Sequence, residues 1–97
     1  MLTSKQRAKL RGMANQLPTL FQIGKNGITP EVVAQVEEAL LPKELIKLSV
    51  LETAPVFARE AAQQLAEALN ADVVQVIGMR FVLYRQSQEN KTIELVK

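Results

Sequence analysis

The sequence predicts an α/β domain in which helices cover a four-stranded mixed β-sheet. Apolar residues recur with helical spacing in three segments and form short runs in four others, in the order α-β-α-β-α-β-β. A chain of 97 residues is long enough for one domain with its own core. Because 47% of the residues are hydrophobic and only 4% are aromatic, we expect that core to consist of Val, Leu, Ile and Ala.

The first helix is predicted over residues 4–15. Thr3 and Gln6, three positions apart, have the form of a capping box at its start. Helical spacing places five apolar residues on one stripe, which we expect to be buried: Leu2, Leu10, Met13, Ala14 and Leu17.

All the charged residues of this helix are basic. Arg7 and Arg11 lie on one flank of the apolar stripe. Lys5 and Lys9 lie on the other flank. Such side chains can simply cover the apolar edges of an exposed helix with their long stems. An exposed helix usually mixes signs, however, and like charges four residues apart cost some stability, so we interpret this surface as a functional basic face.

A glycine-bounded basic loop follows the first predicted strand, residues 20–23. In this loop Gly24 and Gly27 enclose Lys25 and Asn26. Glycine lets a backbone turn sharply and approach another molecule closely, and a cation beside an amide suits a phosphate or a base edge. This GxxG loop, placed before a helix N-terminus, is therefore a candidate seat for a nucleic-acid backbone. Two glycines in a strand-to-helix turn can also serve conformation alone, and that alternative stays open.

The second helix is predicted to begin after Thr29, an N-cap residue, with Pro30 in its first position. It is expected to end at residues 41–43. Its predicted buried face consists of Val32, Val33, Val36, Ala39 and Leu40.

The second strand and the third helix are predicted to pack closely. In the strand, residues 45–51, apolar side chains alternate with Lys47 and Ser49, so one face is expected to be partly exposed. The helix is predicted from about residue 55 to residue 69, before Asn70, which tolerates the left-handed conformation of a C-terminal cap. Its small apolar stripe predicts a close approach to the sheet: Ala58, Ala61, Ala62, Leu65, Ala68 and Leu69.

The last two predicted strands, residues 73–77 and 81–84, form a hairpin around the intervening glycine. Residues 92–96 have β-propensity but no assignable partner. The whole chain is thus predicted to be a single domain, with a core of about residues 2–85 and a C-terminal tail over 86–97.

Composition excludes several classes of function. Without cysteine or histidine, the chain has no disulfide, thiolate nucleophile, imidazole base or Cys/His zinc site, so we expect no enzyme, no metal and no cofactor. No run approaches the roughly 18 apolar residues of a membrane span, and the N-terminus lacks the apolar region of a signal peptide. We therefore expect a cytoplasmic binding protein.

Charge is strongly segregated along the chain, although the net charge is only +2. Residues 1–27 carry +5 with no acid, residues 28–72 carry −5, and residues 73–97 carry +2. Such asymmetry favours a polyanionic partner at the basic end.

Aromatic residues are expected to contribute little to recognition. Phe21, Phe57 and Phe81 fall within apolar runs, so we predict that they belong to the core. Tyr84 is amphipathic and could reach a surface, but we favour a core position for it too. With few groups available to stack on bases, recognition should depend on backbone and shape, with modest sequence specificity.

Four blocks occur in order along the chain. They are Leu2-Thr3-x-Lys5-Gln6-Arg7-x-x-Leu10-Arg11, Gln22-Ile23-Gly24-Lys25-Asn26-Gly27-Ile28-Thr29, Glu44-Leu45-Ile46-Lys47, and Val74-Gln75-Val76-Ile77-Gly78 followed by Val82-Leu83-Tyr84-Arg85. Together they resemble the CRM domain (chloroplast RNA splicing and ribosome maturation), and most closely its single-domain bacterial branch, the YhbY-like proteins.

The resemblance implies an RNA-binding module whose fold is similar to the C-terminal domain of bacterial translation initiation factor three. Bacterial members are associated with precursors of the large ribosomal subunit, and plant relatives assist group II intron splicing. By position, the resemblance implies RNA contacts from the GxxG loop and the neighbouring basic residues. Many members have a small residue at the position of Asn26, and the position of Arg80 varies. With these two departures included, the candidate RNA-binding residues are Gly24, Lys25, Asn26, Gly27, Lys5, Arg7, Lys9, Arg11 and Arg80.

Our hypothesis is that glycine N–H groups and the first turn of the second helix hold phosphates of structured or single-stranded RNA. Lys25 would add a charge, and Asn26 could bond a 2′-OH or a base edge. Pro30 and Glu31 weaken the helix terminus as an anion site, so the loop carries more weight. We expect a monomer that binds ribosomal RNA of large-subunit precursors and assists ribosome assembly.

Two other functions remain open. The acidic residues 28–72 could make the chain a protein-interaction adaptor on assembling ribosomes, although acids on solvated helix exteriors are common. A small hydrolase is the third reading, but no motif places a pair of carboxylates, and the loop lacks the Gly-Lys-Ser/Thr ending of a P-loop.

Overall fold

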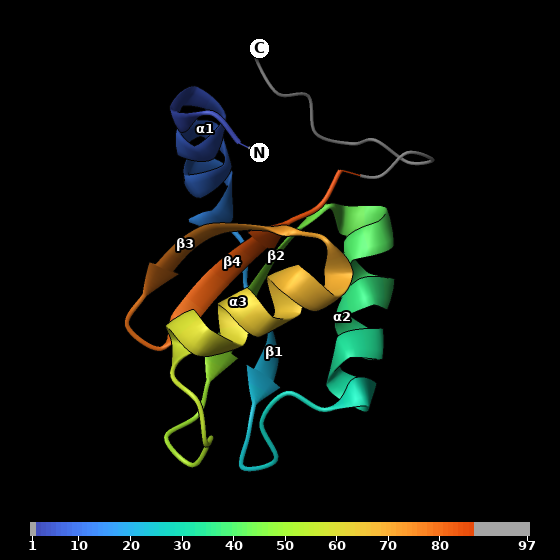
Figure 1. Cartoon of the computed structure of the whole chain (residues 1–97). Coiled ribbons are helices and arrows are strands. Elements are labelled where there is room, and N and C mark those ends of the chain that lie inside the picture. Colours follow the sequence, from blue (N-terminus) through green and yellow to red (C-terminus); the bar gives the residue numbers. More distant parts are fainter. Residues whose placement is uncertain (1, 87–97) are drawn as a thin grey trace.

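The computed structural model describes residues 2–86 and contains the seven predicted elements in the predicted order (Figure 1). Their bounds are α1 Ser4–Ala14, β1 Thr19–Ile23, α2 Pro30–Lys43, β2 Leu45–Val50, α3 Ala58–Leu69, β3 Asp72–Ile77 and β4 Arg80–Tyr84. The strand expectation for residues 92–96 lies outside the described residues.

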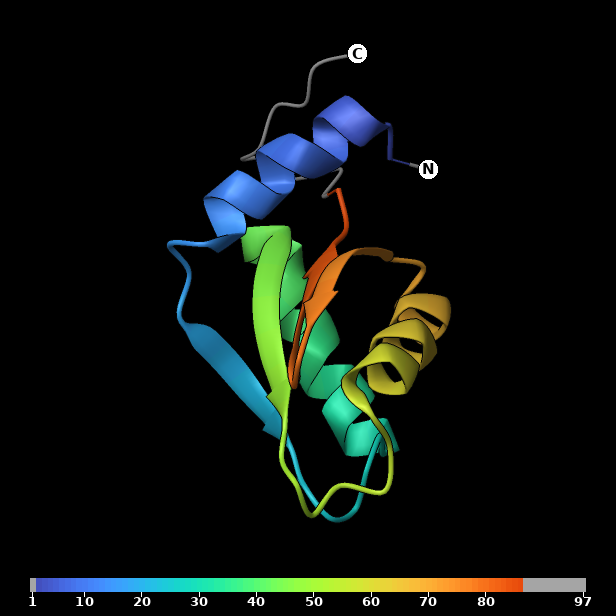
Figure 2. The same cartoon turned by 90° about the vertical axis from the view of Figure 1, so that its left-hand side faces the viewer.

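The four strands form one mixed sheet in the order β1-β2-β4-β3. β1 and β2 are parallel, whereas β4 runs antiparallel to both β2 and β3. Figures 1 and 2 show α2 and α3 on one face of this sheet and α1 on the other, at the opposite end from the loop after β1. The predicted fold class, a mixed sheet covered by helices, is confirmed.

The main core lies between the sheet and helices α2 and α3. Alternation along β2 directs Ile46, Leu48 and Val50 into this core, while Lys47 and Ser49 stay partly exposed on the other face. This arrangement confirms the partly exposed strand face that the sequence predicts.

Helix α3 packs on the sheet through its small residues. Ala61, Ala62 and Leu65 are fully buried, as the stripe predicts. Ala68 is exposed, so its predicted burial is wrong. It lies in the last turn, next to buried Leu69, at the edge of the apolar stripe.

A smaller core cluster holds α1 on the other face of the sheet. Leu10 and Ala14 are completely buried there against residues of β2, β3 and β4. Met13 is 38% exposed, which corrects its predicted burial. Helix α1 covers only one end of this face. The buried part of its apolar stripe is therefore narrower than the sequence predicts.

Two of the core predictions for aromatic residues hold fully. Phe81 is completely buried, and Tyr84 is 4% exposed within the smaller cluster. Burial raises the pKa of the Tyr84 phenol, with the charges of Glu44 and Asp72 acting in the same direction. Phe21 is partly buried and packs against the main core.

The start of α3 departs from the prediction. The helix begins at Ala58, three residues after the expected residue 55, because Phe57 is extended (φ −81°, ψ 163°) and occupies the N-cap position. This position lies outside the apolar stripe of the helix. The Phe57 side chain is consequently 80% exposed, and its predicted place in the core is wrong.

The other helix ends follow the sequence. Thr3 and Gln6 form the predicted capping box, with reciprocal hydrogen bonds of 3.0 and 3.1 Å. Asn70 adopts the left-handed conformation after α3. Among the described residues, no helix is long and apolar enough to cross a membrane.

Candidate nucleic-acid interface

The loop of residues 24–27 is a tight turn at the carboxyl end of β1. The Gly27 N–H donates to the Gly24 carbonyl at 3.0 Å, and Gly27 has a φ of +66° that favours glycine. A Cβ at Gly27 would lie 3.1 Å from Cγ of Pro55. Gly27 therefore has a conformational role, and its N–H is already used within the turn.

Lys25 and Asn26 form the exposed tip of this turn. Within residues 2–86, neither of them makes a hydrogen bond or an ion pair with the protein. An ammonium group, an amide and two backbone N–H groups thus face solvent at one point of the molecule. Such a tip can contact an anion without first breaking an internal bond.

Gly24 differs from Gly27, because the fold does not require it to be glycine. Its backbone does not have a positive φ. A Cβ there would lie 3.9 Å from Cδ1 of Leu51, which is ordinary van der Waals contact. The missing side chain leaves open surface beside the turn, where another molecule can approach the backbone.

We predict that alanine substitutions will separate these two roles. Gly27→Ala should lower the free energy of unfolding by about 1–2 kcal/mol, because it forces a left-handed Cβ toward Pro55. Gly24→Ala should leave stability unchanged within about 0.5 kcal/mol. Denaturant titration of both variants tests this contrast. Equal destabilisation would show that the fold requires both glycines.

The N-terminus of α2, next to the loop, has little capacity left for an anion. The Val32 N–H donates to Oγ1 of Thr29 at 3.2 Å, Pro30 has no N–H, and Glu31 adds a negative charge. These contacts are the reason to expect that this terminus contributes less to anion binding than the glycine loop does.

The basic helix α1 lies far from the glycine loop. The two occupy opposite ends of the molecule (Figures 1 and 2), and strand β1 between them spans about 17 Å. Lys5, Lys9 and Arg11 are exposed on α1. A single phosphate cannot touch both sites, so a common ligand must extend along the sheet.

Arg7 holds α1 in place. Its Nη1 donates to the backbone carbonyls of Val73 and, at 3.3 Å, Val74, and the residue is only partly exposed. Arg7, one of the four basic residues predicted on this helix, is therefore bound to strand β3 of the sheet. It positions the helix that carries the exposed cations.

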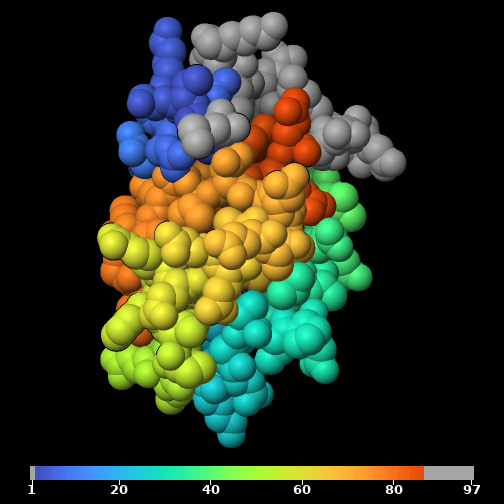
Figure 3. Space-filling view, in the orientation of Figure 1, coloured from blue at the N-terminus to red at the C-terminus, as the bar shows by residue number. Residues whose placement is uncertain are grey.

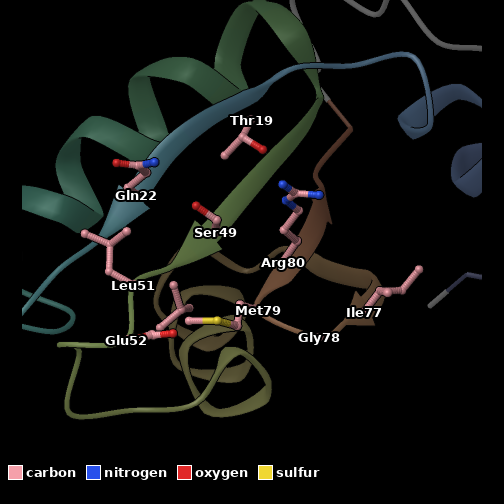
Figure 4. Close-up of a pocket in the computed structure, with 10 residues that line it drawn as sticks. Thr19, Gln22, Ser49, Leu51, Glu52, Ile77, Gly78, Met79 and Arg80 are labelled. Atoms are coloured by element: carbon pink, nitrogen blue, oxygen red, sulfur yellow. The ribbon is translucent and has the colours of Figure 1, made fainter.

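An uncovered part of the sheet lies between α1 and the glycine loop. It forms a shallow hollow of about 570 Å³, in which Gln22, Ser49 and Arg80 project from β1, β2 and β4 (Figure 4). These residues are cross-strand neighbours, because Ser49 pairs with both Gln22 and Arg80. Glu52 lies at the edge of the hollow.

Sequence reasoning found only Arg80 in this hollow. Gln22 and Ser49 were missed as candidates for contact, although the alternation in β2 marks Ser49 as facing away from the main core. Which strands lie beside β2 could not be deduced from the alternation. The row across three strands is therefore visible only in the fold.

Exposed acids are concentrated on one side of the sheet. Helices α2 and α3, seen at the right and centre of the face in Figure 3, carry the exposed acids Glu31, Glu37, Glu38, Glu60 and Glu67 together with the exposed cations Lys43 and Arg59. Glu37 pairs with Arg85 at 3.3 Å. Helix α1, which carries exposed cations, lies on the opposite side of the sheet (Figure 2), where Arg80 projects into the hollow (Figure 4), and Lys25 lies in the turn after β1.

Comparison with known protein families identifies the family to which the chain belongs. The model of the CRS1 / YhbY (CRM) domain matches residues 2–85, nearly the whole chain. The chain belongs to this family. The resemblance on which the site residues were chosen is thus confirmed, whereas their individual roles stay predictions.

Several relatives of this CRM domain align over almost their full length. The "Probable RNA-binding protein YqeI" of Bacillus subtilis is 43% identical over 95 residues, covering 98% of this chain and 99% of that protein. An "RNA-binding protein" of Haemophilus influenzae is 39% identical over 94 residues, covering 93% and 91% respectively. The solution structure of SAV1595 from Staphylococcus aureus has a TM-score of 0.81 and 45% identity, over 99% of this chain and 100% of that one.

Proposed function

We propose that this CRM domain binds RNA through a basic face, defined by the glycine-loop tip Lys25 and Asn26, the exposed α1 cations Lys5, Lys9 and Arg11, and Arg80 in the hollow. The observation that carries the proposal is the separation of these groups from the acids of α2 and α3. The relatives from Bacillus and Haemophilus are named as RNA-binding proteins, which supports RNA as the ligand.

The glycine loop would hold the RNA backbone at one end of this face. Gly24 allows close approach, Lys25 supplies a point charge, and Asn26 can bond a 2′-OH or a base edge. The backbone N–H groups of Lys25 and Asn26 replace that of Gly27 in our initial hypothesis, because the Gly27 N–H is used in the turn.

The rest of the basic face would bind the same RNA further along. An RNA strand that leaves the loop crosses the hollow, where Arg80 offers a cation and Gln22 and Ser49 offer polar side chains. It then reaches Lys5, Lys9 and Arg11 on α1. Contacts with phosphates at both ends would fix the orientation of the RNA on the domain.

We further propose that the RNA is ribosomal RNA of large-subunit precursors, and that the protein acts as a monomer that assists their assembly in the cytoplasm. The membership in the CRM family and the bacterial relatives support this proposal. A binding role is favoured over catalysis, since the relatives from Bacillus and Haemophilus are named as RNA-binding proteins. Crosslinking in cells followed by sequencing would identify the RNA, and its absence from large-subunit sequences would refute the ribosomal part.

The test of RNA binding itself is titration with protein-free RNA at several salt concentrations. If about five cations meet phosphates of single-stranded RNA, log affinity should fall with log salt at a slope of about −3.5. A slope near zero would contradict electrostatic binding by the basic face. An adaptor acting through the acids of α2 and α3 would not bind protein-free RNA at all.

A further inference from the structure

Phe57 is an aromatic residue whose ring is exposed and does not pack in either core cluster. Its side chain is 80% exposed, whereas Phe81 and Tyr84 are buried and Phe21 packs on the main core. An aromatic side chain left in water forgoes a large hydrophobic gain. Its exposure therefore needs another explanation.

The start of helix α3 does not explain it. Phe57 occupies the N-cap, where Ser, Thr, Asp or Asn usually accepts a hydrogen bond, and a phenyl ring cannot do so. The Glu60 carboxylate instead accepts from the Phe57 backbone N–H at 3.3 Å. Another residue at position 57 would keep this bond, so the ring is dispensable for the helix.

The segment that carries Phe57 packs on the glycine loop. The Leu51 N–H donates to the Ile23 carbonyl at 2.9 Å, and Pro55 lies against Gly27. Figures 1 and 2 both show the loops after β1 and β2 side by side at one end of the molecule. Phe57 follows Pro55 by two residues, a distance of at most about 7 Å along the chain.

The surroundings of Phe57 fit one small flat group better than an apolar protein surface. Its nearest exposed neighbours along the chain are Pro55, Arg59 and Glu60, and two of these three are charged. Lys25 supplies a cation on the adjoining loop. A single ring bordered by polar groups and cations matches the flat face of a base attached to a phosphate backbone.

We propose that Phe57 is a stacking platform for an unpaired base of an RNA whose backbone is bound at the glycine loop. This inference rests on the proposed function and deepens it. It adds a preference for single-stranded over duplex RNA at this end of the molecule, because both faces of a base within a duplex are stacked on the neighbouring base pairs and leave no room for the ring. It also replaces the expectation that aromatic residues contribute little.

The direct test uses Phe57→Trp, which gives the chain its only tryptophan. A base stacked on the indole should change its fluorescence when unstructured RNA of mixed sequence is added, and the same strand annealed to its complement should cause a much smaller change. Phe57→Ala should weaken single-strand binding by about 5-fold to 100-fold. Leu41→Ala, at another exposed apolar residue (51%) near the end of α2, is the matched control and should have no effect.

The outcomes separate this inference from the proposed function. If Lys25→Glu weakens RNA binding while Phe57→Ala does not, and the indole signal stays constant, the stacking platform is wrong and RNA binding stands. If the wild-type chain binds no RNA, both proposals fail. Because Phe57 is exposed, both variants should melt at the wild-type temperature, which circular dichroism would verify.

Discussion

Reversing three charges of the basic face, with Lys5→Glu, Arg11→Glu and Lys25→Glu combined, should weaken RNA binding by at least about 100-fold at 0.1 M salt. Each phosphate contact with a single strand is worth about fivefold at this salt concentration, because one contact changes log affinity by about 0.7 per tenfold change in salt. Three lost contacts therefore account for about two orders of magnitude, and repulsion by the new carboxylates adds to the loss. Filter binding or fluorescence anisotropy measures it.

The control for this variant reverses charges on the other side of the sheet. Glu38→Lys and Glu67→Lys change exposed residues of α2 and α3. The salt-dependence slope should fall from about −3.5 to about −1.4 in the basic-face variant and should not fall in the control. If both variants lost affinity equally, the RNA would not be confined to the basic face.

Leu10→Ala should lower both the stability of the domain and its affinity for RNA. Leu10 is completely buried between α1 and the sheet, so its truncation should lower the free energy of unfolding by about 2–5 kcal/mol. It also loosens the helix that presents Lys5, Lys9 and Arg11. RNA affinity should therefore fall on the order of tenfold under conditions where the variant is still folded.

Leu65→Ala provides the comparison for this prediction. Leu65 is equally buried but lies in the main core under α3, away from the basic face. Its truncation should cost a similar free energy of unfolding and leave RNA affinity unchanged. Denaturant titrations and binding curves on both variants would decide the matter, and equal losses of affinity would argue against α1 as part of the interface.

Local patterns in the sequence predicted most of the fold. The capping box of Thr3 and Gln6, the N-cap at Thr29 and the left-handed Asn70 all occur as expected, because each depends on a few neighbouring residues. The predicted buried stripe of α3 is wrong only at Ala68, which lies at the edge of the stripe.

Features that depend on distant contacts could not be predicted. Arg7 resembles the other cations of its helix in the sequence, yet its guanidinium binds carbonyls of β3, far along the chain. Phe57 belongs to an apolar run, but the helix begins one residue later and leaves the ring outside. The hollow arises from strand order, and the separation of α1 from the glycine loop arises from the direction of β1.

The most direct test of the central claim is a nuclear magnetic resonance titration of the labelled protein with single-stranded RNA. Binding at the basic face predicts shifts of backbone amides at Lys25 and Asn26, along α1 and at Arg80, with small changes on the outer surfaces of α2 and α3. Shifts concentrated on α2 and α3, with α1 and the glycine loop unchanged, would contradict the proposed interface.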